Sequence, residues 1–360
     1  MGKKPPPLLL YVSPNGYLGG AERFVVDACR GHQEAENYRP HLLFFEDGEA
    51  VALARRYHLE VTVLRQRFKL RDPVRLARAL AEIRGVHQRL APAVVHATMP
   101  YAHIVCGLAL MGLPAKRVWF QHGPVGGTLD KLATLFATDA MLFNSEYLQG
   151  LHRSAFPQFN VRRGDFVIPL GVAAAKNVTP LFARDTVVFG AAGRLGPFKA
   201  YERLLAAVGP LGPRARLLIA GAAKTASDRA YAEELRARAP ANVTFLGHVD
   251  DMAGLYAEID VFLHSSLAPE PFGLVIAEAM AHGRLAVAPA GGGISALLRH
   301  GQTGLTYDDP SKLATLVADL ASGRDVDALR VLASNGYAEV RATHSISSMA
   351  QHLEDVYRTL

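Results

Sequence analysis

Apolar and polar positions along this 360-residue chain follow two patterns. Short apolar runs that end in glycine or small polar residues predict buried strands, and stretches with apolar residues three and four apart predict helices. The N-terminal half predicts helices at 24–30 and 73–90 and strands at 8–13, 41–45, 61–64, 94–97, 117–121 and 139–146. The stretch 166–172 closes this half. The C-terminal half predicts strands at 187–191, 217–220, 243–246, 260–264 and 285–288, helices at 201–208, 252–258 and 274–282, and a helical stretch at 310–360. Alternating strands and helices indicate an α/β fold with parallel sheets.

The length of the chain and one irregular stretch predict two domains. A chain of 360 residues exceeds what a single hydrophobic core usually serves. Residues 173–185 lose regular periodicity and contain Pro180, as expected of an interdomain linker. We therefore expect a first domain at 1–172 and a second that begins at residue 186.

The stretch from Ser265 to Gly293 concentrates the candidate chemistry. Prolines and Gly273 interrupt the chain after strand 260–264, and a short helix then runs to Gly283. A helix N-terminus offers unpaired backbone N–H groups, which makes its first residues a candidate anion site: Phe272, Gly273 and Leu274. Glu270 and Glu278 flank this site, where like charge makes them poor phosphate ligands but good acceptors for sugar and ribose hydroxyls.

Two glycine-containing loops follow the first strand of each half. After strand 187–191, Arg194 and Lys199 can neutralise a diphosphate. After strand 8–13, Gly19 and Gly20 precede a helix, an arrangement in which backbone amides approach a phosphate closely. The G-x-G-x-x-G spacing of dinucleotide-binding proteins is absent, so a nicotinamide cofactor is not supported.

Polar residues follow two other strands of the N-terminal half. His122 stands at the carboxyl end of strand 117–121, the edge where open α/β sheets bind ligands, although a single histidine there is more often structural. Asn144 and Ser145 end strand 139–146 and would lie at the same edge, which makes them candidate acceptor-binding residues.

The motif Pro-Glu-Pro-Phe-Gly-Leu-Val-Ile-Ala-Glu-Ala-Met-Ala-His-Gly, which contains Glu270 and Glu278, resembles the E-x7-E motif of glycosyltransferase family 4. Gly-Gly-Ala-Glu-Arg at 19–23 and Gly-Arg-Leu with Lys199 are similar to two further family motifs, with Ala200 in place of the usual Gly. Residues 291–294 resemble the family's Gly-Gly-x-Pro-Glu turn, but Ile294 and Ser295 replace Pro-Glu, so no role is carried over for that Glu.

The resemblance implies a GT-B fold: two Rossmann-like domains that face each other across a cleft, with the acceptor mainly on domain 1–172 and the sugar nucleotide mainly on 186–344. The last helix, 345–360, is expected to cross back to the first domain. The family's activity is retaining transfer of a hexose from a UDP- or GDP-linked sugar to a saccharide, lipid-linked or small-molecule acceptor, as in cell-envelope or other glycoconjugate biosynthesis. In the family, a histidine matching His122 approaches the donor sugar.

Several alternatives stay open. The leaving diphosphate can be stabilised by Arg194, Lys199 and helix amides, so we expect no metal and no cofactor. The Asp-x-Asp sequence at Asp325 and Asp327 lies in a helical tail and not at a strand end, so we interpret it as a chance match. A glycoside hydrolase could use Glu270 and Glu278 as acid and nucleophile. A nucleotide-sugar epimerase is also conceivable. A non-enzymatic binding protein is least favoured, because Arg194, Lys199, Glu270 and Glu278 would have no catalytic role in it.

Charge and cysteine content add weaker indications. The net charge of +6 suits anionic partners, or it reflects a GC-rich genome that favours arginine codons. Nucleic acid is not expected among the partners. Helix 73–90 has a basic face and follows four further cations at 65–71, so it could contact an anionic membrane or an anionic acceptor, or be a solvated surface helix. Cys29 and Cys106 form no metal or redox motif, and no apolar run is long enough for a membrane span or signal peptide. We therefore expect a cytoplasmic protein, with contact at the inner membrane face left open.

Overall fold

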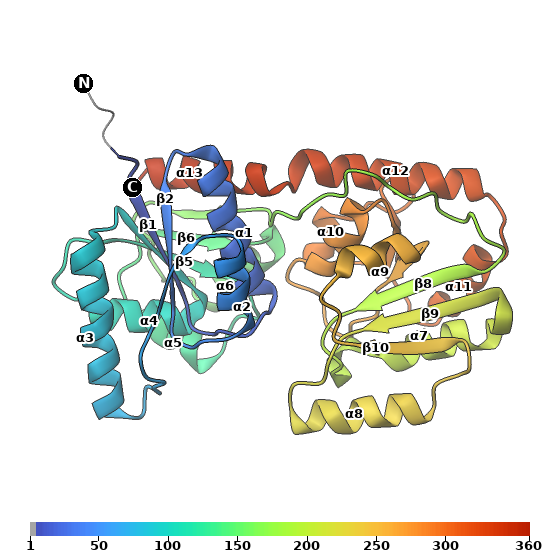
Figure 1. Cartoon of the computed structure of the whole chain (residues 1–360), viewed down its shortest axis with the longest axis horizontal. Coiled ribbons are helices and arrows are strands. Elements are labelled where there is room, and N and C mark those ends of the chain that lie inside the picture. Colours follow the sequence, from blue (N-terminus) through green and yellow to red (C-terminus); the bar gives the residue numbers. More distant parts are fainter. Residues whose placement is uncertain (1–4) are drawn as a thin grey trace. The chain divides into compact units, whose positions relative to one another are not determined.

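The computed structural model describes residues 5–360, so the first four residues of the predicted N-terminal domain lie outside it. The chain divides into two compact units (Figure 1). Unit 1 comprises the residues up to Gly171 together with Ser345–Leu360, and unit 2 comprises Val172–His344. The chain therefore leaves unit 1 next to residue 172, where the first domain was predicted to end, and returns at residue 345.

Unit 1 is built on a parallel sheet that has seven strands within the described residues, in the order β3-β2-β1-β4-β5-β6-β7. Its strands are β1 (Leu8–Ser13), β2 (Arg39–Phe44), β3 (Glu60–Val63), β4 (Val94–Thr98), β5 (Lys116–Gln121), β6 (Ala140–Phe143) and β7 (Asp165–Val167). Its helices are α1 (Gly20–Ala35), α2 (Glu49–Arg56), α3 (Pro73–Leu90), α4 (Met99–Ala109), α5 (Thr128–Ala133), α6 (Glu146–Ala155) and α13 (Ile346–Arg358).

Side chains of β1 alternate between two helical layers, as the pleat of a strand requires. Leu8, Leu10 and Val12 pack with apolar side chains of α3 and α4 in one core cluster. Tyr11 points to the opposite layer, where its hydroxyl lies 2.8 Å from His32 of α1 and 2.7 Å from the Tyr357 hydroxyl of α13. All six residues of β1 are buried, which explains its nearly continuous apolar sequence.

The last helix, α13, belongs to unit 1 through a buried polar network. The Tyr357 hydroxyl also lies 2.6 Å from Nδ1 of His96 in β4, and His32 Nδ1 lies 3.0 Å from Glu354. Packing between α1 and α13 is close, and a Cβ atom on Gly31 would lie 2.6 Å from the Cβ atom of Ala350. This network fixes residues from both ends of the chain in one core.

Unit 2 repeats the same design with a parallel sheet of six strands in the part of the chain described, in the order β10-β9-β8-β11-β12-β13. Its strands are β8 (Val187–Ala192), β9 (Ala215–Ala220), β10 (Val243–Gly247), β11 (Val261–Leu263), β12 (Leu285–Pro289) and β13 (Leu305–Tyr307). Its α-helices are α7 (Tyr201–Val208), α8 (Ala226–Ala237), α9 (Met252–Glu258), α10 (Leu274–Ala281), α11 (Lys312–Ala321) and α12 (Val326–Thr343), with 3-10 turns η1 (Pro197–Lys199), η2 (Gly209–Arg214) and η3 (Gly292–Ala296).

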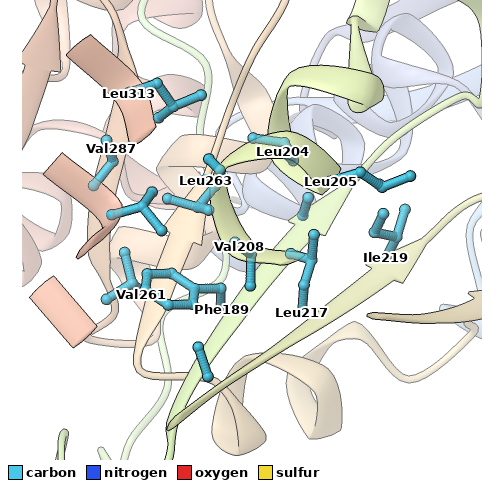
Figure 2. Packing of buried hydrophobic residues seen from close by; sticks show 14 of the residues in the cluster. Phe189, Leu204, Leu205, Val208, Leu217, Ile219, Val261, Leu263, Val287 and Leu313 are labelled. Atoms are coloured by element: carbon cyan, nitrogen blue, oxygen red, sulfur yellow. The ribbon is translucent and has the colours of Figure 1, made fainter. Parts of the chain in front are cut away.

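Figure 2 shows the core on one face of this sheet. Phe189 of β8, Val261 of β11 and Val287 of β12 pack in one cluster with Leu204 and Val208 of α7. Buried apolar area is the main stabilising term in such a core, at about 25 cal/mol per Å². In both units the strand order reverses beside the first strand, which places a ligand-binding switch point at the carboxyl ends of β1 and β4, and of β8 and β11.

The prediction of an α/β fold with two parallel sheets is confirmed. The predicted strand 139–146 is shorter, because Ser145 caps helix α6 and accepts a hydrogen bond from Leu148 N. In the stretch 166–172, strand β7 ends at Val167, two residues before Pro169, which has no N–H group for a strand ladder.

Residues 173–185, which were predicted to be the interdomain linker, group with unit 2. Arg284, which is 1% exposed, donates to the carbonyl oxygens of Thr179, Ile259 and His282 at 2.7, 2.8 and 2.9 Å. Burial lowers the pKa of this guanidinium to about 10, which leaves it charged at neutral pH. Arg284, which directly precedes β12, therefore binds Thr179 of this segment to the rest of unit 2.

Within residues 5–360, no helix is both long and apolar enough to cross a membrane. Cys29 and Cys106 are both buried free thiols.

Candidate active site

Glu270 is the centre of a polar cluster at the carboxyl ends of β8 and β11. Its Oε1 atom accepts hydrogen bonds from Lys199 Nζ, from His264 Nε2 at 3.1 Å and from the Ser266 hydroxyl at 2.7 Å. His264 and Ser266 follow β11 directly, and Lys199 ends the 3-10 turn after β8. The sequence predicted Lys199 and Glu270 as site residues but did not predict that they are bonded to each other, or that His264 and Ser266 join them.

The cluster holds Glu270 in its ionised form. Burial raises the pKa of the Glu270 carboxyl, but the hydrogen bond from His264 and the charge of Lys199 outweigh this effect, and the pKa lies well below its usual range. Burial lowers the pKa of His264, so its imidazole is neutral at pH 7 and Nε2 carries the hydrogen that it donates. The arrangement is a carboxylate with three donors, not a carboxylic acid.

A glycine turn fixes the backbone that carries Glu270. The N–H group of Gly293 donates to the Glu270 carbonyl oxygen at 2.8 Å. A Cβ atom on Gly293 would lie only 1.9 Å from the carbonyl oxygen of Pro271, so a side chain at this position would displace the loop. The replacement of Pro-Glu by Ile294 and Ser295 leaves this backbone contact in place, and the Ile294 side chain is buried.

The predicted helix N-terminus is present beside this loop. Helix α10 begins at Leu274, and Gly273 precedes it in the left-handed conformation with φ of 94°. The first N–H groups of a helix have no intrahelical acceptor, so this end of α10 can receive an anion. The Phe272 side chain is buried, with its ring centroid 5.6 Å from that of His344, so this residue anchors the loop.

Glu278 lies on the second turn of α10. Its Oε2 atom accepts a hydrogen bond from the Tyr256 hydroxyl at 3.0 Å, which links α10 to α9. Tyr256 was not among the predicted site residues, because nothing in its local sequence pairs it with a residue 22 positions away.

Arg194 is held by a partner that the sequence analysis missed. Its Nε and Nη2 atoms donate to the two carboxylate oxygens of Asp228, at 2.7 and 3.2 Å. Asp228 also accepts from the N–H groups of Lys224 and Thr225, and the Thr225 side chain caps α8. The bond with Arg194 and those backbone donors hold the pKa of Asp228 well below its usual range. The Thr225-x-x-Asp228 capping box was visible in the sequence, but its second role as a partner of Arg194 was not.

The backbone around Lys199 is equally constrained. The Ser265 hydroxyl donates to the carbonyl oxygens of Lys199 and Ala200, at 2.8 and 3.2 Å. Ala200, which replaces the family's usual Gly, has φ of 50°, in the left-handed region that glycine adopts more readily. The next residue, Tyr201, is 3% exposed, and its hydroxyl has no hydrogen-bond partner among residues 5–360. Tyr201 is a further polar group near this cluster that the apolar pattern of α7 concealed.

The candidate residues of unit 1 lie at the carboxyl edge of its own sheet. His122 follows β5, is 9% exposed and stacks on Phe120 at a centroid distance of 4.0 Å. Burial lowers the pKa of His122 to about 3, so the imidazole is neutral, and its Nε2 atom has no partner within the described part of the chain. Asn144 donates to the His122 carbonyl oxygen at 3.2 Å, which brings these two predicted residues together. The Ser145 hydroxyl caps α6, so it has a structural bond.

The first glycine loop also lies at this edge. Gly19 is the N-cap of α1 and Gly20 its first residue, so the helix starts four residues before the predicted position 24. A Cβ atom on Gly19 would lie 2.7 Å from the Glu22 carboxylate, which accepts a hydrogen bond from Asn15.

No group of three or more histidine, cysteine or acidic side chains within residues 5–360 is arranged to hold a metal ion. Asp325 is the N-cap of α12, and Asp327 is solvent-exposed and pairs with Arg330.

Comparison with solved structures defines the class of protein. The structure resembles that of Anabaena Alr3699/HepE in complex with UDP and glucose, with a TM-score of 0.83 and 24% identity over 98% of this chain and 99% of that chain. It also resembles sucrose-phosphate synthase from Thermosynechococcus elongatus, with a TM-score of 0.78 and 19% identity over 98% of each chain. The fold is therefore that of the GT-B glycosyltransferases, as the resemblance in the sequence implied.

The family follows from the sequence itself. Residues 18–174 match the family described as "Glycosyltransferase Family 4", and residues 186–322 match "Glycosyl transferases group 1". Together the two matches cover most of the chain, and the chain belongs to the family 4 glycosyltransferases.

Curated relatives match over shorter stretches. The "D-inositol 3-phosphate glycosyltransferase" of Mycobacterium sp. (strain JLS) is 37% identical over 151 residues, which are 40% of this chain and 34% of that protein. The "Putative glycosyltransferase YtcC" of Bacillus subtilis (strain 168) is 29% identical over 192 residues, 49% of this chain and 46% of that protein. The matched part thus spans between about a third and a half of the length of these relatives.

Proposed function

We propose that this chain is a retaining hexosyltransferase that moves a hexose from a nucleoside-diphosphate sugar to a saccharide, lipid-linked or small-molecule acceptor. Cell-envelope or other glycoconjugate biosynthesis is the expected setting. The observation that carries the proposal is the cluster of Lys199, His264, Ser266 and Glu270 beside the N-terminus of α10, at the switch point of the unit 2 sheet. Cations, an ionised carboxylate and free helix amides suit an anionic ligand that also carries hydroxyl groups.

Each charged group has a role in the proposed reaction. Departure of the nucleoside diphosphate leaves negative charge on its phosphate oxygens, and Arg194, Lys199 and the first amides of α10 stabilise that charge. Their positions are fixed in advance by Asp228 and Glu270, so little reorganisation is needed when the ligand binds. Because these groups supply the positive charge, we propose that transfer needs no metal and no cofactor.

The two glutamates bind hydroxyl groups in this proposal. Glu270, with one carboxylate held by three donors, accepts from the transferred sugar, and Glu278 accepts from the ribose. The neutral imidazole of His122 approaches the donor sugar, and Gly19 and Gly20 approach its phosphates, as in the family. Asn144 and Ser145 contribute to acceptor binding.

The ionised state of Glu270 argues against this residue as the acid of a glycoside hydrolase. A hydrolase of the common type needs one carboxyl group that is protonated at working pH, to act on the leaving oxygen. The pKa of Glu270 lies well below its usual range, and Lys199 would disfavour loss of that negative charge. A nucleotide-sugar epimerase would use the same donor contacts, and it differs by forming product without any acceptor.

Thermal-shift measurement with UDP, GDP and ADP and their sugar conjugates, without added metal, tests the proposal. A ligand that binds the native protein raises its melting temperature by mass action. UDP and its conjugates come first, because HepE, which shares the fold, was crystallised with UDP. Selective stabilisation by one nucleotide series is expected, whereas stabilisation by free oligosaccharides alone would favour the hydrolase. The cytoplasmic location and the contact with an anionic membrane stay predictions.

A further inference from the structure

The positive charge of the chain is concentrated in one segment of unit 1. Residues 65–89 contain eight arginine and lysine residues and two acidic residues, a net charge of +6. This equals the formal net charge of all 360 residues, so the rest of the chain is balanced. A genome-wide preference for arginine codons would enrich arginine throughout but would not place the whole charge excess in 25 residues.

The cations are presented by a local alternation after β3. Leu64 and Phe68 are buried and Leu70 packs partly against the same core, while the odd-numbered cations Arg65, Arg67, Lys69 and Arg71 are exposed. The Phe68 ring is anchored by Phe45 and Tyr101, at centroid distances of 5.3 and 6.1 Å. The segment is therefore an ordered support for its charges and not a loose basic tail.

A hollow of about 630 Å³ lies beside this segment. Its charged lining residues are Glu46, Arg67, Lys69, Arg71, Asp72 and Arg75. Two of the four cations have carboxylate partners: Arg67 lies 3.6 Å from Glu46, and Arg75 lies 3.5 Å from Asp72. Among residues 5–360, no ion pair is found for Lys69 or Arg71. The net charge of +2 in this lining matches a phosphate group, which carries close to two negative charges at neutral pH.

The hollow also lies where an acceptor would be bound. Glu46 follows β2 and the basic segment follows β3, so both stand at the carboxyl edge of the sheet that also carries His122 and Asn144. Among the large apolar side chains of residues 65–89, Val74 is the strongly exposed one. A single apolar side chain would insert little into a membrane.

We infer that the acceptor of this enzyme carries a phosphate or diphosphate group, which binds at Lys69 and Arg71 in this hollow. The inference rests on the proposed transferase function, since it names the class of its acceptor. A lipid-linked saccharide diphosphate and a soluble sugar phosphate share this chemistry.

Binding of pyrophosphate and of farnesyl diphosphate to the full chain, measured by titration calorimetry at low ionic strength, tests the inference. The protein carries Arg194→Ala and Lys199→Ala throughout, so that the proposed donor site does not bind the probe. Addition of Lys69→Gln and Arg71→Gln is expected to weaken binding by about tenfold or more, because charge-assisted contacts are lost. The matched control is Arg214→Gln with Arg229→Gln, which removes the same charge from two exposed positions of unit 2. Circular dichroism checks that each variant is folded.

Equal affinities in the two pairs of variants, or no binding of either probe by the parent, would overturn the inference. Sedimentation with vesicles of phosphatidylcholine, with and without phosphatidylglycerol, tests whether the segment binds an anionic membrane surface instead. Binding to the anionic vesicles without binding of either diphosphate would assign the segment to a membrane surface and also overturn it. Tighter binding of farnesyl diphosphate than of pyrophosphate indicates a lipid carrier, and equal binding indicates a soluble acceptor. Failure of the nucleotides to stabilise the wild-type protein would refute the transferase proposal separately.

Discussion

Lys199 and Glu270 form an ion pair in which the two side chains are only 14% and 17% exposed. Removing one partner of such a pair leaves the other charge in surroundings that solvate it poorly. The Glu270→Gln variant is therefore expected to lose about 3 kcal/mol of unfolding free energy in urea denaturation, in addition to its activity. Glu339→Gln is the matched control, because the Glu339 and Arg299 side chains of its ion pair are 30% and 46% exposed. This variant should lose less than about 1 kcal/mol of unfolding free energy. Similar losses of unfolding free energy in both variants would show that the buried ion pair stabilises the fold no more than the exposed one.

Replacement of Arg194 and Lys199 tests the stabilisation of the leaving group. Arg194→Ala combined with Lys199→Ala is expected to lower kcat by about a thousandfold, with the fold retained, because the cations act on charge that develops in the transition state. Asp228→Asn keeps Arg194 but weakens the fork that orients it, so its loss should be smaller. Steady-state kinetics with the nucleotide sugar found by thermal shift gives both values. Turnover close to that of the wild type in the double variant would refute the diphosphate role.

Glu278 is predicted to bind the ribose of the nucleotide. Glu278→Ala should weaken nucleotide binding by about tenfold or more, since a hydrogen bond to a charged group contributes roughly 1.5–3 kcal/mol. Tyr256→Phe removes the hydroxyl that bonds Glu278 at 3.0 Å but keeps the carboxylate, so we expect a smaller effect from it. Calorimetric titration of the nucleoside diphosphate measures both, and an unchanged affinity in Glu278→Ala would remove the ribose assignment.

Buried histidines predict that the protein loses stability in mild acid. Burial lowers the pKa of His103 and His122 to about 3 and that of His152 to about 4, and the pKa of His96 lies well below its ordinary value. In the unfolded chain these groups titrate near about 6.5. The buried neutral imidazoles therefore cost no stability above that pH. As the pH falls below it, the unfolded chain binds protons that the folded protein does not, and the free energy of unfolding decreases by about 2 kcal/mol for each fully buried histidine by pH 5.

Melting temperatures between about pH 7.5 and pH 5 check this expectation. His103→Gln should flatten the pH dependence, because it removes one group that the folded protein cannot protonate. His352→Gln, at an exposed position of α13, should leave the dependence unchanged. A melting temperature that stays constant over this range would contradict the prediction.

The spacing of apolar residues was sufficient to predict several helices. Helices α3, α7 and α9 have the bounds that the pattern predicts, and α10 ends one residue earlier. Helix α4 was missed, because Met99–Ala109 is apolar almost all round and has no polar face to reveal a period. Its burial between neighbouring elements of unit 1 accounts for that composition.

In the candidate site, too, some residues could be predicted from local sequence and others could not. Glu270, Glu278, Arg194 and Lys199 stand in motifs that can be recognised locally, but their partners are set by the fold. Asp228 is 34 residues from Arg194, and Glu270 is 71 residues from Lys199, so only the parallel sheet brings these pairs together. The Tyr201 hydroxyl, which has no hydrogen-bond partner within residues 5–360, was likewise not predicted, because a tyrosine at a core position of an amphipathic helix resembles an apolar residue.

The network around Tyr357 has a consequence for the order of events during protein synthesis. Residues 172–344 are contiguous and leave the ribosome before residues 345–360, so unit 2 can fold while unit 1 still lacks α13. Until that helix emerges, Tyr11 and His96 have no Tyr357 hydroxyl to bind, and the face of α1 that packs on Ala350 is exposed to water. The domain that is translated first is thus the one that is completed last, and a nascent chain carries its N-terminal sheet without α13 throughout the synthesis of unit 2.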